Sequence, residues 1–246
     1  MNVEAIVPAA GLGLRLKAAL PNRQAGIPKP LVKIADKPIL IYTLCVLSRI
    51  KSIKRIILAV NKEYLDNFRE VLKRFPLKKR IDLVLGGASR RESVENCLKT
   101  IDSAANIILV HDAVRPFVSK DLIDRLLKEA RVSPAVISGV PVKATIKSVK
   151  VSKCQGVKEG CMVEKTLNRD NLWEIQTPQV FRRELLLEAY EKYRNPAVTD
   201  DASLVEKLGV KVKVVRGSYF NIKITTPEDL VFAKTIVKSF PLRKRS

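Results

Sequence analysis

One stretch of the sequence decides the fold: Val3-Glu4-Ala5-Ile6-Val7, followed directly by Pro8-Ala9-Ala10-Gly11-Leu12-Gly13-Leu14-Arg15. Its first five residues predict a short strand, and the small residues and glycines that follow predict a tight turn. Because few Cβ atoms crowd such a turn, its backbone can pass close to a ligand. Successive backbone N–H groups in a turn of this kind form a concavity that suits anions, typically phosphates. The stretch therefore predicts a phosphate-binding loop at the end of a strand.

Two cations accompany the predicted loop: Arg15 within it, and Lys29 in the segment Ile27-Pro28-Lys29-Pro30-Leu31. Commoner glycine loops fit less well, since Leu16 stands where a dinucleotide-binding fingerprint needs its third glycine. The Gly-Lys-Ser/Thr ending of a Walker A loop is missing as well. An ordinary tight turn between two elements remains the alternative. The two cations favour a site that grips a nucleoside triphosphate.

Candidate strands and candidate helices alternate along the rest of the chain. Strands are predicted at 55–60, 81–85, 107–110, 135–140 and 212–215, and helices at 39–50, 64–75, 90–101, 119–127, 182–193, 199–208 and from 227 onward. Ser89, with Glu92 three residues later, Ser119 and Thr199 are the expected amino-terminal caps of three of these helices. Strands that alternate with helices predict βαβ units. The runs at 55–60 and 107–110 are apolar throughout, which is typical of strands buried on both faces. The expected fold is α/β: a Rossmann-like, mainly parallel sheet flanked by helices.

Between 142 and about 168 the pattern changes to short β-branched runs separated by polar turns. This pattern predicts a β-hairpin arm that leaves the sheet rather than a second domain. We therefore expect a single domain over residues 1–240, with 142–168 as the arm and a basic tail at 241–246.

Three of the predicted strand ends carry glycines or polar side chains: the Gly11 loop, Gly86-Gly87 and His111-Asp112. In open parallel sheets, ligands collect beyond the carboxyl ends of the strands. We expect these ends to form one site, with Asp112 beside Arg115 as a candidate ligand for Mg²⁺, which typically uses one or two carboxylates plus substrate phosphates. His111 is the only histidine, and hydrogen bonds that fix the strand end are its expected role.

Charge and hydropathy restrict the class of protein. The chain has 246 residues and a net charge of +21, yet its lysines and arginines are spread along the sequence and are not interleaved with aromatic residues. This spread predicts no specific nucleic-acid site. No apolar run approaches the roughly 20 residues that cross a bilayer, and we recognise no signal peptide. We expect a cytoplasmic protein without a membrane partner.

Eight motifs in the same order make the chain similar, over essentially its whole length, to the 2-C-methyl-D-erythritol 4-phosphate cytidylyltransferase family. They are Pro8-Ala9-Ala10-Gly11-x-Gly13-x-Arg15, Pro28-Lys29, Gly86-Gly87-x-x-Arg90-x-x-Ser93-Val94, His111-Asp112-Ala113-x-Arg115-Pro116, Arg169-x-x-Leu172-Trp173, Thr177-Pro178-Gln179, Thr199-Asp200-Asp201-Ala202 and Asn221-Ile222-Lys223-Ile224-Thr225-x-Pro227-Glu228-Asp229.

The resemblance implies transfer of CMP from CTP to a sugar-alcohol phosphate, with Mg²⁺ and release of pyrophosphate. It assigns Arg15, Lys29 and Lys223 to the α-phosphate, and Asp112 to both substrates and the metal. It places Ala9, Ala10, Gly11, Gly87 and Ser93 around CTP, and Arg115, Thr145, Thr177, Thr199 and Arg169 around the polyol phosphate. It also implies a homodimer through the arm, in which Arg169 reaches the partner's site.

Three other activities stay open on the sequence alone. A ribitol 5-phosphate cytidylyltransferase shares most of these motifs, and a nucleotide-sugar pyrophosphorylase of the same fold shares the Pro28-Lys29-Pro30-Leu31 segment. A basic nucleic-acid-binding protein without enzymatic activity is the alternative from a different class, and it would bind with a steep dependence on salt.

Overall fold

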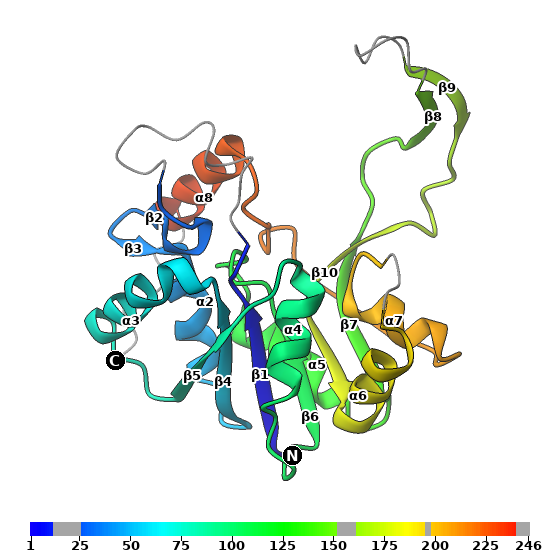
Figure 1. Cartoon of the computed structure of the whole chain (residues 1–246). Helices are drawn as coiled ribbons and strands as arrows, with labels where there is room; N and C mark the ends of the chain where they lie inside the picture. The colour runs from blue at the N-terminus through cyan, green and yellow to red at the C-terminus, as the bar shows by residue number, and fades with distance from the viewer. Residues whose placement is uncertain (12–25, 152–160, 195–197, 240–246) are drawn as a thin grey trace.

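The computed structural model describes residues 1–11, 26–151, 161–194 and 198–239. In these residues a seven-stranded sheet carries helices on both faces, and a two-stranded arm projects away from it (Figure 1). The order of the strands across the sheet is β11 (Lys213–Arg216), β7 (Ala135–Pro141), β10 (Trp173–Arg182), β6 (Ile107–Val110), β1 (Val3–Pro8), β4 (Ile53–Val60) and β5 (Arg80–Leu85). All neighbours pair in parallel except β10, which is antiparallel to both β6 and β7. The predicted mainly parallel sheet is confirmed.

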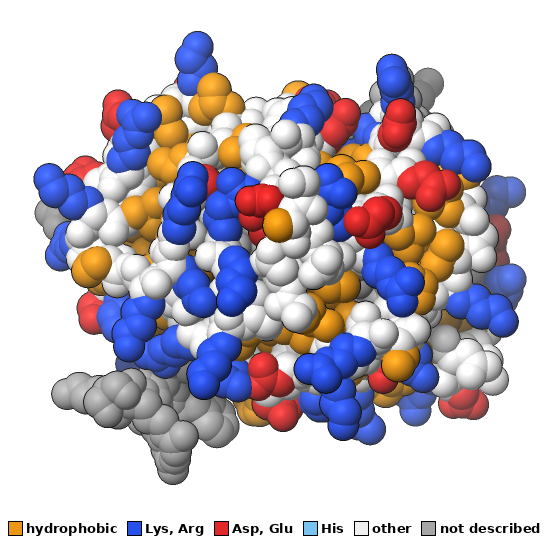
Figure 2. All heavy atoms as spheres, turned by 90° about the horizontal axis from the view of Figure 1, so that it is seen from below, with side chains coloured by type: hydrophobic (Ala, Val, Ile, Leu, Met, Phe, Trp, Pro, Cys, Tyr) orange, Lys and Arg blue, Asp and Glu red, His pale blue; other side chains and the backbone are white. Residues whose placement is uncertain are grey.

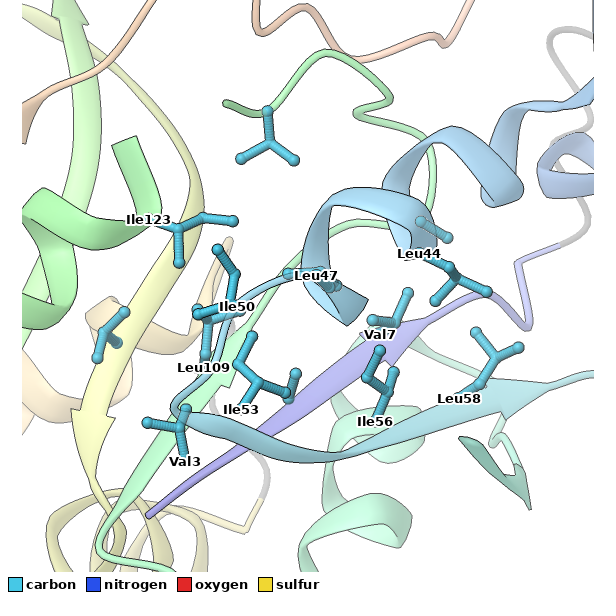
Figure 3. Packing of buried hydrophobic residues seen from close by; sticks show 14 of the residues in the cluster. Val3, Val7, Leu44, Leu47, Ile50, Ile53, Ile56, Leu58, Leu109 and Ile123 are labelled. Carbon is cyan, nitrogen blue, oxygen red and sulfur yellow. The ribbon is translucent and has the colours of Figure 1, made fainter. Parts of the chain in front are cut away.

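The strands are buried on both faces because helices cover each side of the sheet. Val3, Ala5 and Val7 of β1 pack in one cluster with α2 (Ile39–Ser48), α3 (Leu65–Arg74) and α5 (Lys120–Glu129). Figure 3 shows Leu44 and Leu47 of α2 close to Val7 and to the apolar side chains of β4. Ile6 points to the other face, where α4 (Arg90–Leu98), α6 (Arg183–Lys192) and α7 (Asp201–Lys207) form the second cluster.

The order in which successive strands are added to the sheet reverses at β1. The chain passes from β1 to β4 and β5 on one side, then returns to place β6 on the other side of β1. The crevice beyond the carboxyl ends at such a reversal is where ligands bind in open α/β sheets. The loop after β1, with Ala9, Ala10 and Gly11, lies at this crevice.

A third apolar cluster joins two segments that are distant in sequence. It contains Val32 and Ile34, which follow η1 (Lys29–Leu31), together with Ile224 and Leu230. Ile34 belongs to the small β2 (Lys33–Ile34)–β3 (Lys37–Pro38) hairpin, and Leu230 belongs to α8 (Pro227–Ser239). A second short turn, η2 (Lys62–Tyr64), follows β4. The cluster thus fixes the segments that carry Lys29 and Lys223 beside each other.

The predicted hairpin is confirmed as β8 (Lys147–Val151) paired with β9 (Cys161–Thr166), which project from the body of the molecule in Figure 1. Among the described side chains of this arm, three large apolar ones are exposed: Val149, Met162 and Val163. Among the described helices, none has the length and apolar content needed to span a membrane.

Two local expectations were wrong. The residue that caps α7 is Asp200, whose Oδ1 accepts a hydrogen bond from Ser203 N at 3.1 Å, and not Thr199. No strand was expected where β10 lies. Its pairing with β7 shifts register between Gln176 and Gln179, and proline tolerates a sheet interior only at such an interruption. Pro178 therefore concealed the strand in the sequence.

Candidate active site

A cavity of about 320 Å³ opens beyond the carboxyl ends of β1, β4 and β6. Its wall is formed by the turn after β1, the turn before α4 and Asp112, which follows β6. Lys29 and Lys223, from the two segments that the third apolar cluster joins, complete it. The predicted site residues that line it are Ala9, Ala10, Gly11, Lys29, Gly87, Ser93, Asp112 and Lys223.

Two turns meet closely at the floor of this cavity. Gly86 N donates to Val60 O at 2.9 Å, and a Cβ built on Gly86 would lie only 2.3 Å from the Cβ of Ala10. Ser93, which is buried, accepts a hydrogen bond from Gly87 N at 3.2 Å and donates to Ser89 O at 2.9 Å. Ser93 therefore holds the turn that carries Gly87, and Gly86 is small because the turn after β1 leaves no room for a side chain.

A second cavity of about 180 Å³ adjoins the first. Arg115, Thr177 and Thr199, which were predicted to hold the second substrate, line it together with Gln176, Gln179 and other residues of β10 and the start of α7. Arg90, Asp112 and Lys223 line both cavities. These three side chains, which we call the shared wall, separate the two binding spaces.

Asp112 is the electrostatic centre of the shared wall. Its Oδ1 lies 3.1 Å from Arg90 Nε, and its Oδ2 lies 2.9 Å from Lys223 Nζ and 3.5 Å from Arg115 Nε. Burial alone would raise the pKa of this carboxyl, but the charges of Arg90, Lys223 and Arg115 lower it well below its usual value. The carboxylate is therefore ionised at neutral pH and holds three cations in place.

Backbone hydrogen bonds anchor the segment that carries Lys223. Arg115 Nη1 donates to Asn221 O at 2.8 Å, and Ile224 N donates to Val114 O at 2.9 Å. Asn221 Nδ2 in turn donates to Thr177 O at 2.9 Å. Lys223 is thus held from both sides against the loop that follows β6.

His111 has the structural surroundings that the sequence predicted. The ring is fully buried, with Nδ1 3.1 Å from Thr177 Oγ1 and Nε2 3.2 Å from Arg115 O. Thr177 Oγ1 also accepts from Asp112 N at 3.0 Å. Burial lowers the pKa of His111 to about 4, despite the opposing charge of Asp112, so the ring is neutral at pH 7. His111 lines neither of the two cavities.

Replacing His111 by alanine is expected to lower the free energy of unfolding by roughly 2–4 kcal/mol, because it leaves a buried cavity and unpaired partners. Urea unfolding followed by circular dichroism measures the change. The matched control is Lys128→Ala on the exposed face of α5, which should change stability by no more than about 0.5 kcal/mol. Equal stability of the His111 variant and the wild type would contradict the structural role.

Two predicted site residues, Thr145 and Arg169, line neither cavity, and the position of a third stays untested. Arg15 lies outside the described residues. Thr145 and Arg169 lie exposed at the base of the arm, where Arg169 Nη1 donates to Lys143 O at 2.5 Å, and neither of them lines a cavity. Their catalytic and binding roles stay predictions.

The structure also adds residues that the sequence reasoning did not assign. Asn61 directly follows β4, so its place at a strand end was a signal that could have found it. Arg90 stood in a matched motif but received no role, although it borders both cavities. Gln176, Gln179 and Asp200 line the second cavity, and the two glutamines were missed because β10 was missed.

Phosphoryl transfer depends chiefly on positioning phosphates among cations, and this pair of cavities offers glycine turns and cations at the carboxyl edge of a mainly parallel sheet. The arrangement defines a nucleotidyltransferase. The chain matches the family model for 2-C-methyl-D-erythritol 4-phosphate cytidylyltransferase over residues 3–239. It belongs to this family, as the motifs predicted.

Relatives and solved structures cover nearly the whole chain. A 2-C-methyl-D-erythritol 4-phosphate cytidylyltransferase of Bacillus velezensis is 42% identical over 97% of both chains. One from Dictyoglomus thermophilum is 43% identical over 92% of this chain and 96% of its own. The crystal structure of 4-diphosphocytidyl-2C-methyl-D-erythritol synthase from Anaerococcus prevotii is 35% identical, with a TM-score of 0.79 over 96% of this chain and 98% of that one.

Proposed function

We propose that this protein transfers CMP from CTP to 2-C-methyl-D-erythritol 4-phosphate, forming CDP-methylerythritol and pyrophosphate for isoprenoid precursor biosynthesis. The observation that carries the proposal is the shared wall, because Arg90, Asp112 and Lys223 border two adjacent cavities. Such a wall lets a nucleotide and a phosphomonoester meet at one phosphorus atom. The family and the names of the relatives support this activity over ribitol phosphate or hexose phosphate as the acceptor.

The chemistry needs cations more than it needs a base. A phosphate oxygen of the acceptor attacks the α-phosphorus of CTP, a new P–O bond forms, and the bond to the β-phosphate breaks to release pyrophosphate. The attacking oxygen is already ionised at neutral pH, so no side chain has to remove a proton. Lys29 and Lys223, with Arg15, stabilise the charge on the α-phosphate, while Arg115 and Thr199 hold the acceptor phosphate. A mechanism without a general base is consistent with His111, which is neutral, buried and outside both cavities.

Asp112 fits the predicted magnesium ion as its one protein ligand. Among the described residues no three His, Cys, Asp or Glu side chains form a metal cluster, but Mg²⁺ typically needs only one or two carboxylates besides substrate phosphates and water. A carboxylate has about four lone-pair positions. Arg90, Arg115 and Lys223 form ion pairs with Asp112, which leaves about one lone-pair position for the metal. When bound, the ion would neutralise the triphosphate, and Asp112 would fix its position.

The arm supplies the rest of the proposal: a homodimer in which Arg169 and Thr145 complete the partner's acceptor site. Two observations support it. The arm exposes Val149, Met162 and Val163, and Arg169 lies outside both cavities of its own chain. Exposed apolar side chains on a projecting hairpin favour contact with a second chain.

Mixing two inactive variants tests this arrangement. Arg169→Ala subunits and Lys29→Ala subunits, exchanged at a one-to-one ratio, should recover about a quarter of wild-type turnover, since half of the dimers would carry one intact site. The control is each variant alone, treated in the same way. Absence of recovery after proven subunit exchange would place Arg169 in its own chain's site or outside the mechanism.

A screen for pyrophosphate release tests the activity itself. Purified protein is incubated with each of four nucleoside triphosphates and with methylerythritol, ribitol or hexose phosphate, with and without Mg²⁺. Release is expected only with CTP, methylerythritol 4-phosphate and the metal together. Release with ribitol phosphate or a hexose phosphate in its place would overturn the proposed acceptor.

The distribution of charge supports a small-molecule enzyme rather than a nucleic-acid-binding protein. On the face shown in Figure 2, Lys and Arg side chains are interrupted by acidic and apolar ones and form no continuous stripe. Nucleic-acid binding is expected to be weak and to vanish at physiological salt. We place the enzyme in the cytoplasm, because its substrate CTP is supplied there.

A further inference from the structure

Two side chains, Tyr190 and Asp201, lie behind the shared wall, line neither cavity and connect to Arg90 of the wall. Tyr190 of α6 donates its hydroxyl to Asp201 Oδ1 at 2.5 Å. Asp201, at the start of α7, forms an ion pair from its Oδ2 to Arg90 Nη1 at 2.8 Å. Arg90, at the start of α4, then donates Nε to Asp112 Oδ1 at 3.1 Å. Residues of three separate helices, α6, α7 and α4, thus converge on the carboxylate of Asp112.

The burial of Asp201 shows what it can and cannot do. Its side chain is 1% exposed and lines neither cavity, so it cannot touch a substrate. A buried carboxylate is tolerated when it is paired and hydrogen-bonded. Asp201 Oδ1 accepts the hydrogen bond from Tyr190, and Oδ2 has the ion pair with Arg90 but no hydrogen bond. Arg90, by contrast, is partly exposed and borders both cavities. Asp201 can therefore influence the reaction only through Arg90.

We propose that Asp201, supported by Tyr190, is a positioning residue that fixes the guanidinium of Arg90 and thereby orients Asp112. The planar guanidinium presents its donors in a rigid fork, so an anion on Nη1 determines where Nε points. Arg90 then holds Asp112 Oδ1, which leaves Oδ2 to Lys223 and Arg115. This inference rests on the proposed function, since it assigns the network to the same reaction.

Arg90 forms ion pairs with two carboxylates, Asp112 and Asp201, and removing the charge of Asp201 abolishes one of these pairs. The guanidinium then has Asp112 as its remaining carboxylate partner among the contacts described, and it is no longer held from behind. A shift of reacting groups by about 1 Å can lower the rate about a hundredfold. We therefore expect the loss in kcat rather than in the affinity for CTP.

A second arginine network in the same protein provides the matched control. Arg55 bridges Glu4, at 2.8 Å, and Asp82, at 3.0 Å, and the side chain of Glu4 is buried like that of Asp201. Glu4 lies in the amino-terminal half of β1, whereas the cavities lie beyond its carboxyl end. Glu4→Gln therefore removes a buried carboxylate from a bridging arginine without touching the site.

The test compares Asp201→Asn, Tyr190→Phe and Glu4→Gln with the wild type. For each full-length enzyme, kcat, the KM for CTP, the KM for the acceptor and the melting temperature are measured. Asp201→Asn should lower kcat at least about tenfold with the KM for CTP within about threefold, the signature of a contact used in the transition state. Tyr190→Phe should lower kcat about three- to tenfold, and Glu4→Gln should lower the melting temperature while kcat stays within about twofold.

Each result decides the inference. A kcat of Asp201→Asn within twofold of wild type overturns it, and so does a loss of kcat in Glu4→Gln as large as in Asp201→Asn. If Asp201→Asn does not fold, Tyr190→Phe decides, because it removes one hydroxyl and keeps the ion pair. A wild-type enzyme that releases no pyrophosphate from CTP and methylerythritol 4-phosphate contradicts the proposed function instead.

Discussion

Replacing Lys223 by alanine is expected to lower kcat by about two to three orders of magnitude, the usual loss when one donor to a developing charge is removed. Lys223 Nζ lies 2.9 Å from Asp112 Oδ2 and borders both cavities. It is therefore placed to contact the α-phosphate and the incoming phosphate together. Its side chain is 41% exposed, so its loss leaves no buried cavity and the melting temperature should change little. Initial rates of pyrophosphate release at saturating CTP measure the effect.

The matched control for this variant is Lys234→Ala. Lys234 lies on the exposed face of α8, the helix that follows the Lys223 segment. The Lys234→Ala substitution removes one positive charge, as Lys223→Ala does, from a neighbouring part of the chain. We expect its kcat to stay within about twofold of wild type. A Lys223 variant with unchanged turnover would remove Lys223 from the mechanism. A control variant with an equal loss would show that net charge rather than position is responsible.

Replacing Gly86 by alanine is expected to raise the KM for CTP at least about tenfold and to lower stability by roughly 1–3 kcal/mol. The added Cβ would lie 2.3 Å from the Cβ of Ala10 and 2.8 Å from Ser93 Oγ. Neither neighbour has a flexible side chain that can move away. The turn after β1, which lines the cavity, must therefore shift. Steady-state kinetics and thermal unfolding measure the two effects.

Gly26→Ala is the control, because a Cβ at Gly26 would meet nothing within 4 Å and the residue lies outside the first cavity. It should leave the KM for CTP and the melting temperature close to wild type. A Gly86 variant that binds CTP as well as the wild type would show that the two turns separate without harm to the site.

The sequence predicted the elements whose signal is local. Apolar strands at 55–60 and 107–110 and the capping serines Ser89 and Ser119 appear in the structure where they were expected. Ser89 Oγ accepts from Glu92 N at 3.1 Å, so the cap works as its spacing indicated. Strand β10 lacked such a signal, because Gln176, Thr177, Pro178 and Gln179 are neither alternating nor continuously apolar.

The candidate site was predictable where a chemically distinctive residue follows a strand. Gly11, Gly87 and Asp112 belong to this group, and the structure places all three at one cavity. Contacts between distant segments were not predictable, since no local pattern couples Arg90 to Asp201 or Lys223 to Asp112. The arm residues illustrate a further limit, because Arg169 and Thr145 lie outside both cavities of their own chain and their predicted roles would need the proposed second subunit.

The shared wall has a practical consequence for inhibitor chemistry. Because Arg90, Asp112 and Lys223 border both cavities, a single bisubstrate molecule that joins a cytidine nucleotide through a spacer to a polyol phosphate can occupy the two spaces at once. Its second half would bind at the high effective concentration set by the linker. Such a molecule gains affinity from tethering alone, and its best linker length reports the distance across the wall.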